Sequence, residues 1–145
     1  PNINFLLVGQ GPLKNNLLDK CKINGIKNVK FKSNVSQKKL GDLMRQSRIF
    51  LFPSLDEGHP QVVGQAIACG LPVIMMKTIM PDYVINDYNG YLVEKDQDIE
   101  HKIKILLNDK ELYNKMSKNG ILNSKKYDWK KITNKWEEVF VEVTF

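Results

Sequence analysis

Short apolar runs alternate with amphipathic stretches along most of the chain. The apolar runs predict strands at residues 2–9, 28–31, 48–53, 71–76 and 90–93. Apolar residues at helical spacing predict helices at residues 13–24, 36–46, 60–69, 99–107, 110–127 and 129–141, and a short helical turn at 81–86. Buried strands separated by helices are typical of an α/β fold, with a parallel sheet covered by helices on both faces.

Single residues add expectations about where helices begin, end, bend or pack. Gly70 suits the position just past the third predicted helix, because glycine tolerates the left-handed backbone found there. Asp96-x-Asp98 is expected to mark a helix start with Asp at the N-cap, and Gly120 to kink or split residues 110–127. Trp129 and Trp136 are expected to anchor the packing of the last helix.

The strand ends indicate where a ligand would bind. In open parallel sheets the binding crevice lies at the carboxyl ends of the strands. The loops after Val8, Phe31, Pro53 and Met76 are therefore the predicted walls of such a crevice.

Composition narrows the class of protein. The 145 residues are enough for one domain, with 42% hydrophobic and 26% charged residues. No apolar run reaches the roughly 20 residues that cross a bilayer. Because the chain opens directly on a predicted strand, we expect an excised piece of a longer cytoplasmic protein. Cys21 and Cys69 fit no metal-ligand spacing and are predicted to be reduced, partly buried thiols.

The net charge of +6 comes almost entirely from lysine. Such an excess suits an anionic small ligand or an anionic membrane surface, or reflects the composition of the genome alone. A nucleic-acid partner is not expected, because the lysines are scattered and form no cluster with arginine and aromatic residues.

The loop after the third predicted strand carries the main chemical signal. Glu57 and Gly58 precede Pro60, which is pre-organised for the first turn of a helix. Free N–H groups in that turn, together with the helix dipole, suit a phosphate. Gln65 follows roughly 7.5 Å along the helix, which matches the distance from a terminal phosphate to the ribose of a nucleoside diphosphate.

This segment resembles the core motif of family 4-like retaining glycosyltransferases (glycosyl transferases group 1), which have the two-domain GT-B fold. The matching stretches are Pro53-Ser54, Glu57-Gly58-His59-Pro60, Ala66–Val73, Val8-Gly9-Gln10-Gly11-Pro12, Asn28–Phe31 with Val35, Asn89–Val93 and Tyr127-Asp128-Trp129. The resemblance covers nearly the whole chain.

The resemblance implies a Rossmann-like half of GT-B, with residues 1–145 as the nucleotide-sugar-binding C-terminal domain. The acceptor-binding N-terminal domain would be missing, together with an Arg and a Lys that neutralise the departing diphosphate. It implies Glu57 as the catalytic residue that contacts the donor sugar, and Gln65 at the ribose. The remaining substrate-binding residues that it implies are Gly9, Gly11, Val35, Gly58, His59, Pro60, Gln61, Val62 and Val63.

The chain departs from the family pattern at three places. Gln65 stands where the family has a second glutamate, which replaces a charge-assisted hydrogen bond by a neutral one and predicts weaker donor binding. Thr78-Ile79-Met80 replaces glycines, and Ser33 replaces a glycine near the base.

The function that follows is retaining hexosyl transfer from a UDP- or GDP-sugar to a glycan or lipid-linked glycan, without cofactor or metal. Asp-x-Asp is absent from the four crevice loops, and His59 is expected to contribute its backbone only. One alternative is a nucleotide-sugar-binding module that has lost catalysis, and another is a GT-B nucleotide-sugar epimerase. A Rossmann dehydrogenase is disfavoured, because Lys14 occupies the third-glycine position of Gly-x-Gly-x-x-Gly.

Overall fold

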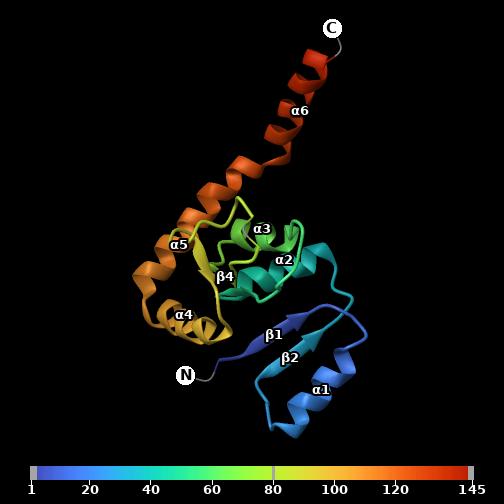
Figure 1. Ribbon diagram of the computed structural model, residues 1–145, viewed down its shortest axis with the longest axis vertical. Helices are drawn as coiled ribbons and strands as arrows, with labels where there is room; N and C mark the ends of the chain where they lie inside the picture. Colours follow the sequence, from blue (N-terminus) through green and yellow to red (C-terminus); the bar gives the residue numbers. More distant parts are fainter. Residues whose placement is uncertain (1–2, 80, 144–145) are drawn as a thin grey trace. The chain divides into compact units, whose positions relative to one another are not determined.

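The computed structural model describes residues 3–79 and 81–143, which fall into two compact units, Pro1–Leu40 and Gly41–Phe145 (Figure 1). In the first unit, β1 (Phe5–Val8) and β2 (Val29–Lys32) form a parallel ladder and are joined through α1 (Lys14–Ile23). Helix α2 (Gln37–Gln46) crosses the boundary between the units, and the Ser36 hydroxyl accepts a hydrogen bond from the Lys39 N–H at 3.3 Å. Ser36 thus caps the start of this helix.

The first strand is less buried than its apolar sequence predicts. Leu7 and Val8 are each 39% exposed, and none of the described residues between 3 and 40 is fully buried. A two-stranded ladder with one connecting helix cannot enclose a strand on both faces. The expectation of a buried strand is thus wrong, and part of its predicted range, Asn2, lies outside the described residues.

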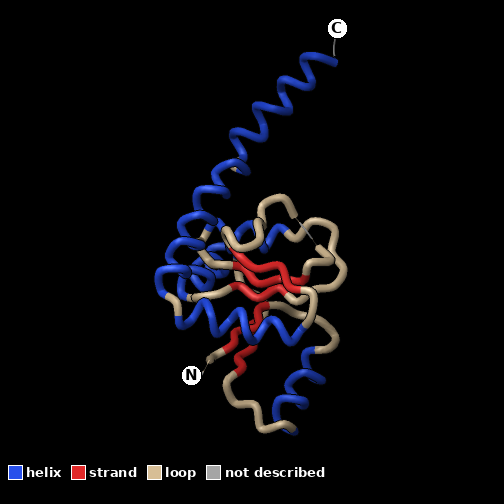
Figure 2. Tube along the Cα trace, turned by 60° about the vertical axis from the view of Figure 1, so that its left-hand side comes forward, coloured by secondary structure: helices blue, strands red, loops and turns tan. Residues whose placement is uncertain are grey.

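The second unit contains a three-stranded parallel ladder in the order β3-β4-β5. Its elements are β3 (Phe50–Phe52), α3 (Gln61–Ala68), β4 (Val73–Met76), β5 (Gly90–Val93), α4 (Asp96–Asn108), α5 (Lys110–Ser124), the 3-10 helix η1 (Lys125–Tyr127) and α6 (Trp129–Val143). Phe50 and Gly90 flank Val73 in register. Figure 2 shows the strands of this unit side by side, with helices around them.

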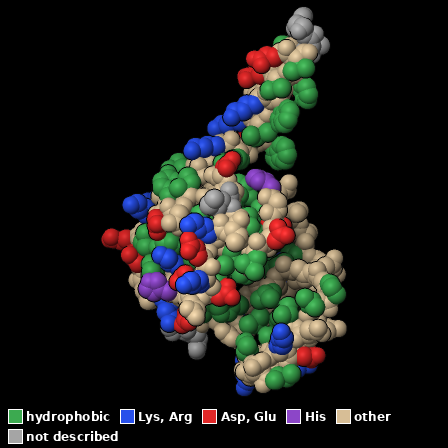
Figure 3. Space-filling view, in the orientation of Figure 1, with side chains coloured by type: hydrophobic (Ala, Val, Ile, Leu, Met, Phe, Trp, Pro, Cys, Tyr) green, Lys and Arg blue, Asp and Glu red, His purple; other side chains and the backbone are tan. Residues whose placement is uncertain are grey.

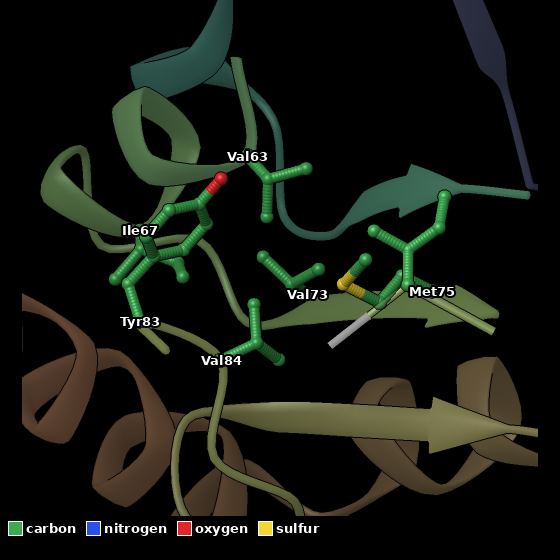
Figure 4. Close-up of a cluster of buried hydrophobic side chains, with 7 residues drawn as sticks. Val63, Ile67, Val73, Met75, Tyr83 and Val84 are labelled. Carbon is green, nitrogen blue, oxygen red and sulfur yellow. The ribbon is translucent and has the colours of Figure 1, made fainter. Parts of the chain in front are cut away.

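The central strand β4 forms the core of the second unit. All four of its side chains are buried, and because successive side chains of a strand point to opposite faces, both faces of β4 are covered. Helix α3 contacts β3 and β4, whereas α4 contacts β4 and β5. On one face, Val73 and Met75 pack with Val63 and Ile67 of α3 (Figure 4). The predicted α/β class with parallel strands is confirmed, although the described strands form two ladders rather than one.

Several helix boundaries can be compared with the local sequence signals that predicted them. Gly70 has φ +80, and the N–H groups of Gly70 and Leu71 donate to the carbonyls of Ile67 and Ala66, which is the predicted glycine-terminated helix end. The predicted Asp cap is wrong, because Lys95 occupies the N-cap without a side-chain capping bond, and Asp96 and Asp98 both lie in the first turn of α4. The short helical turn predicted at residues 81–86 is a single turn, closed by the Val84 N–H and the Pro81 carbonyl at 2.9 Å.

The predicted break at Gly120 is also wrong. Helix α5 runs through this glycine without interruption. Gly120 is buried, and an added Cβ there would lie 3.2 Å from Cγ2 of Ile67 in α3. The glycine thus permits two helices to approach closely, and the packing between them outweighs its low helix propensity.

The last helix exposes much of its apolar surface. Figure 3 shows hydrophobic side chains in green on the surface of this helix. Trp129 and Trp136 are 81% and 57% exposed, so the structure does not place them as packing anchors. Trp136 instead lies against Phe140 of the same helix, with ring centroids 5.8 Å apart. Over residues 3–79 and 81–143, no helix combines the length and the apolar character needed to cross a membrane. Cys21 and Cys69 are free, half-buried thiols, as predicted.

Candidate functional site

The loop between β3 and α3 leads to an open helix N-terminus. Pro60 has φ −73 and ψ 88, so it is the N-cap residue, and the helix begins at Gln61 rather than at Pro60 as expected. Pro60 is buried, whereas Gln61 is exposed. No side chain caps this helix, and its first turn contains no acidic residue. The positive end of the helix dipole is therefore left uncompensated by the protein itself.

Two backbone donors are available at this helix start. Within the described part of the chain, the N–H groups of Gln61 and Val62 have no acceptor. The Val63 N–H donates to the Pro60 carbonyl at 2.9 Å, and the Val63 side chain is fully buried in the core. Val63 is thus a core residue whose N–H is used within the protein, and its predicted contact with the donor phosphates stays a prediction. Val62 is half-buried and packs against the same core.

The residues just before the helix are open to solvent. Glu57, Gly58 and His59 are all exposed, and no partner for the Glu57 carboxylate occurs among the described residues. A Cβ added at Gly58 would have no atom within 4 Å, so space for a ligand is present beside the backbone. Glu57 is therefore free to accept hydrogen bonds from hydroxyl groups of a bound molecule.

Gln65 lies one helical turn beyond Gln61. Residues four apart project from the same side of a helix, about 6 Å from one another along the axis. Both glutamine side chains are exposed, and neither has a hydrogen-bond partner in the described structure. The structure therefore brings the predicted residues 57–63 and Gln65 together on one loop and one helix, with the side chains of Glu57, Gln61 and Gln65 exposed.

Tyr83 supports this helix start and was missed by the sequence analysis. Its hydroxyl donates to the Pro60 carbonyl at 2.8 Å, and its ring meets the His59 ring edge-on, with centroids 5.1 Å apart. Burial, with a smaller contribution from Tyr127, raises the pKa of Tyr83, so the hydroxyl keeps its proton and remains a donor. No sequence signal marked this role, because the contact joins residues that are 23 positions apart.

The segment after β4, where the resembled family has glycines, contributes a side chain to the core here. Ile79 is 5% exposed and belongs to the core cluster, whereas Thr78 is exposed. Met80 lies outside the described residues. An isoleucine at position 79 is therefore explained by packing around β4.

The remaining predicted residues belong to the first unit. Gly9 and Gly11 are exposed, and a Cβ added at either would meet no atom within 4 Å. Val35 is half-buried, and Ser33 accepts a hydrogen bond from the Lys14 ammonium group at 2.9 Å. The Ser33 hydroxyl is thus occupied within the protein, and contacts of Gly9, Gly11 and Val35 with a nucleotide stay predictions.

Across the residues that the structure describes, no three His, Cys, Asp or Glu side chains gather as metal ligands.

Comparison with known proteins places this geometry in a family. The chain matches the family described as glycosyl transferases group 1 over residues 1–122. An uncharacterized glycosyltransferase of Methanocaldococcus jannaschii is 30% identical over 146 residues, which covers 99% of this chain and 42% of that protein. The UDP-Gal:alpha-D-GlcNAc-diphosphoundecaprenol alpha-1,3-galactosyltransferase of Escherichia coli is 30% identical over 126 residues, which covers 82% of this chain and 31% of that protein. The chain thus spans about two fifths or less of the length of these relatives.

A solved structure shares the fold of this chain. The structure of Anabaena HepE in complex with UDP-glucose matches with a TM-score of 0.85 and 21% identity, over 98% of this chain and 42% of that chain. At this identity the match shows a shared fold. Because the family match extends over residues 1–122 and the parallel α/β architecture agrees with it, this chain belongs to the glycosyl transferases group 1 family.

Proposed function

We propose that this chain is the donor-binding part of a retaining glycosyltransferase, which transfers a hexose from a nucleotide-diphosphate sugar to an acceptor. One observation carries the proposal, namely the uncapped start of α3 with an unpaired carboxylate, Glu57, in the loop before it. Unused N–H groups and a helix dipole favour a phosphate, and a free carboxylate favours sugar hydroxyls. A nucleotide-diphosphate sugar contains both kinds of group next to each other.

Each group then has a defined role. The N–H groups of Gln61 and Val62 hold the diphosphate, with the backbone from Gly58 to Pro60 shaping the loop. Glu57 orients the sugar, and Gln65 binds the ribose hydroxyls. When the glycosidic bond breaks, negative charge grows on the leaving diphosphate while the sugar becomes oxocarbenium-like. The two N–H groups are already fixed at the helix start, so they stabilise that charge without reorganisation. Glu57 holds the sugar in one orientation as it reacts.

The relatives support a donor and an acceptor class. The Escherichia coli relative is named for transfer from UDP-Gal to a diphosphoundecaprenol-linked sugar, and HepE was solved with UDP-glucose. These names favour UDP over GDP as the donor nucleotide and a lipid-linked glycan as the acceptor. The greater length of the relatives supports an acceptor-binding domain in the same protein. A lipid-linked acceptor would place the protein in the cytoplasm, in peripheral contact with the membrane.

Calorimetric titration with UDP, GDP and ADP and their glucose-bearing forms tests the proposal. The chain is expected to prefer one nucleotide and to bind its sugar form about tenfold more tightly, which corresponds to about 1.4 kcal/mol. Glu57→Ala should abolish this extra affinity and leave binding of the bare nucleotide unchanged. Asp56→Ala is the matched control, because Asp56 is an exposed carboxylate in the same loop.

Two results would contradict the proposal. Failure of wild-type protein to bind any of the three nucleotides would remove the donor-binding role. Equal sugar-dependent affinity in wild type and Glu57→Ala would show a nucleotide-binding module without a sugar site, which is the alternative favoured by Gln65 at the second glutamate position.

A further inference from the structure

The side chain of Tyr83 connects the core of the second unit to the start of α3. Tyr83 is 4% exposed and packs in the same cluster as Val63 and Ile67 (Figure 4). A phenylalanine would fill this apolar space equally well. The buried hydroxyl therefore calls for a separate explanation, because a polar group inside a core costs stability unless it is hydrogen-bonded.

The backbone of Tyr83 is held by two buried amides. Its carbonyl accepts from Asn89 Nδ2 at 2.8 Å and from Asn123 Nδ2 at 3.1 Å. Asn89 is 0% exposed and Asn123 is 4% exposed, and Asn89 also accepts from the Ile85 N–H at 2.8 Å. Buried and fully paired polar groups fix local geometry strongly. The backbone of Tyr83 is thus anchored to Asn123 of α5 and to Asn89, which directly precedes β5.

The ring itself is enclosed by three contacts. His59 and Tyr127 meet it edge-on, with centroids 5.1 and 5.8 Å away. Gly64 of α3 faces the ring, and a Cβ added there would lie 3.9 Å from it, which is ordinary contact distance. These contacts hold the Tyr83 ring in place, so the surrounding side chains set the position of its hydroxyl.

The Tyr83 hydroxyl contacts the carbonyl of Pro60, the N-cap residue of α3. The Pro60 carbonyl accepts from the Tyr83 hydroxyl at 2.8 Å and from the Val63 N–H at 2.9 Å. A peptide unit is planar and trans, so its C=O and the N–H of the next residue point in opposite directions. Because the Pro60 carbonyl is held toward Tyr83, the Gln61 N–H of the same peptide plane must point away from it.

We propose that Tyr83 is a positioning residue, which aims the Gln61 N–H at the diphosphate of the donor by holding the Pro60 carbonyl. This inference rests on the proposed donor site at α3. The ligand it serves is the diphosphate of a nucleotide sugar, and its contribution is separate from the contacts of the sugar and the base. Loss of the hydroxyl lets the 60–61 peptide rotate, which weakens phosphate binding while the fold is kept.

The test compares UDP with uridine, which lacks the diphosphate, by NMR titration of the ¹⁵N-labelled chain. If the chain prefers GDP, GDP and guanosine take their place. Tyr83→Phe is expected to weaken diphosphate binding by about three- to tenfold and to leave nucleoside binding unchanged. The ligand-induced shift of the Gln61 amide should shrink as well. Tyr127→Phe is the matched control, because its ring touches Tyr83 and its hydroxyl has no hydrogen-bond partner in the described structure.

The ratio of diphosphate to nucleoside affinity separates positioning from general destabilisation, since a merely looser fold lowers both. Asn123→Leu supplies a second variant. It removes one of the two bonds to the Tyr83 carbonyl from the distant helix α5, and it should lower the same ratio. Equal ratios in wild type, Tyr83→Phe and Asn123→Leu would overturn the positioning role. A wild-type chain that binds no nucleotide would instead overturn the proposed function on which it rests.

Discussion

At the residue scale, Gln65 is the position where a single change should strengthen binding. Its side chain is exposed on α3 without a partner in the described structure, so a glutamate fits there without rearrangement. A carboxylate accepts hydrogen bonds from both ribose hydroxyls, and charge-assisted bonds are roughly twice as strong as neutral ones.

We therefore predict that Gln65→Glu tightens UDP binding by about five- to tenfold, measured by calorimetry. Gln61→Glu is the control, because it adds the same charge one turn earlier, beside the diphosphate, and should weaken binding. The gain at position 65 should shrink with 2′-deoxy-UDP, which keeps only the 3′-hydroxyl. Equal gains for UDP and 2′-deoxy-UDP would show that Gln65 does not contact the 2′-hydroxyl.

The residues around Gln65 show which features of the site could be predicted from the sequence motif. Glu57, Gly58 and Gln65 are accessible, as the pattern of the loop and helix predicts. The use of the Val63 N–H by the Pro60 carbonyl was not predictable, since it depends on how the backbone turns into the helix. The contact of Tyr83 with Pro60 was also beyond prediction, because it is a long-range contact without a sequence pattern.

At the element scale, the close approach of β4 and β5 depends on Gly90. A Cβ added at Gly90 would lie 2.4 Å from the Val73 carbonyl oxygen, which is a backbone atom that cannot yield without disturbing the ladder. Gly64 differs, because an added Cβ there would make ordinary contact with the Tyr83 ring.

Gly90→Ala is predicted to destabilise the fold by about 2–4 kcal/mol, through strain and lost strand pairing. Gly64→Ala should change stability by less than about 1 kcal/mol, and in the stabilising direction, because alanine favours a helix. Urea unfolding monitored by circular dichroism measures both. A Gly90→Ala variant as stable as Gly64→Ala would mean that β5 moves freely away from β4.

Elements were predictable where a local signal decides them. The strand at Gly90–Val93 and the glycine-ended helix before Gly70 follow from apolar runs and from the backbone freedom of glycine. The expectations of an Asp cap at Asp96-x-Asp98 and of a break at Gly120 were wrong. Helix α4 already begins at Asp96, with Lys95 as its N-cap, and packing of Gly120 against Ile67 keeps α5 continuous.

At the scale of the whole molecule, the two units differ in how much they bury. Of the described residues from 3 to 40 none is fully buried, whereas every side chain of β4 is. Local opening requires less free energy where few apolar contacts must be broken.

Hydrogen exchange measured by NMR is therefore predicted to distinguish the units. Amides in β1 and β2 should exchange at least about 100-fold faster than those of β4, after correction for intrinsic rates. Both ladders are parallel, but β2 pairs with one strand and β4 with two, so the comparison uses only amides that are hydrogen-bonded within a ladder. Equal protection in β1 and β4 would show that the chain opens as a single cooperative unit.

The sequence by itself determined the alternation of strands and helices, the parallel α/β class, the glycine that ends α3 and the loop that presents Glu57. These features depend on local periodicity and backbone preference, which are properties of a few neighbouring residues. Tertiary structure alone decided that the Pro60 carbonyl uses the Val63 N–H, that Gly120 serves packing, and that Tyr83 holds Pro60. The reason is that burial and hydrogen bonding between distant segments depend on which surfaces meet, and no short stretch of sequence contains that information.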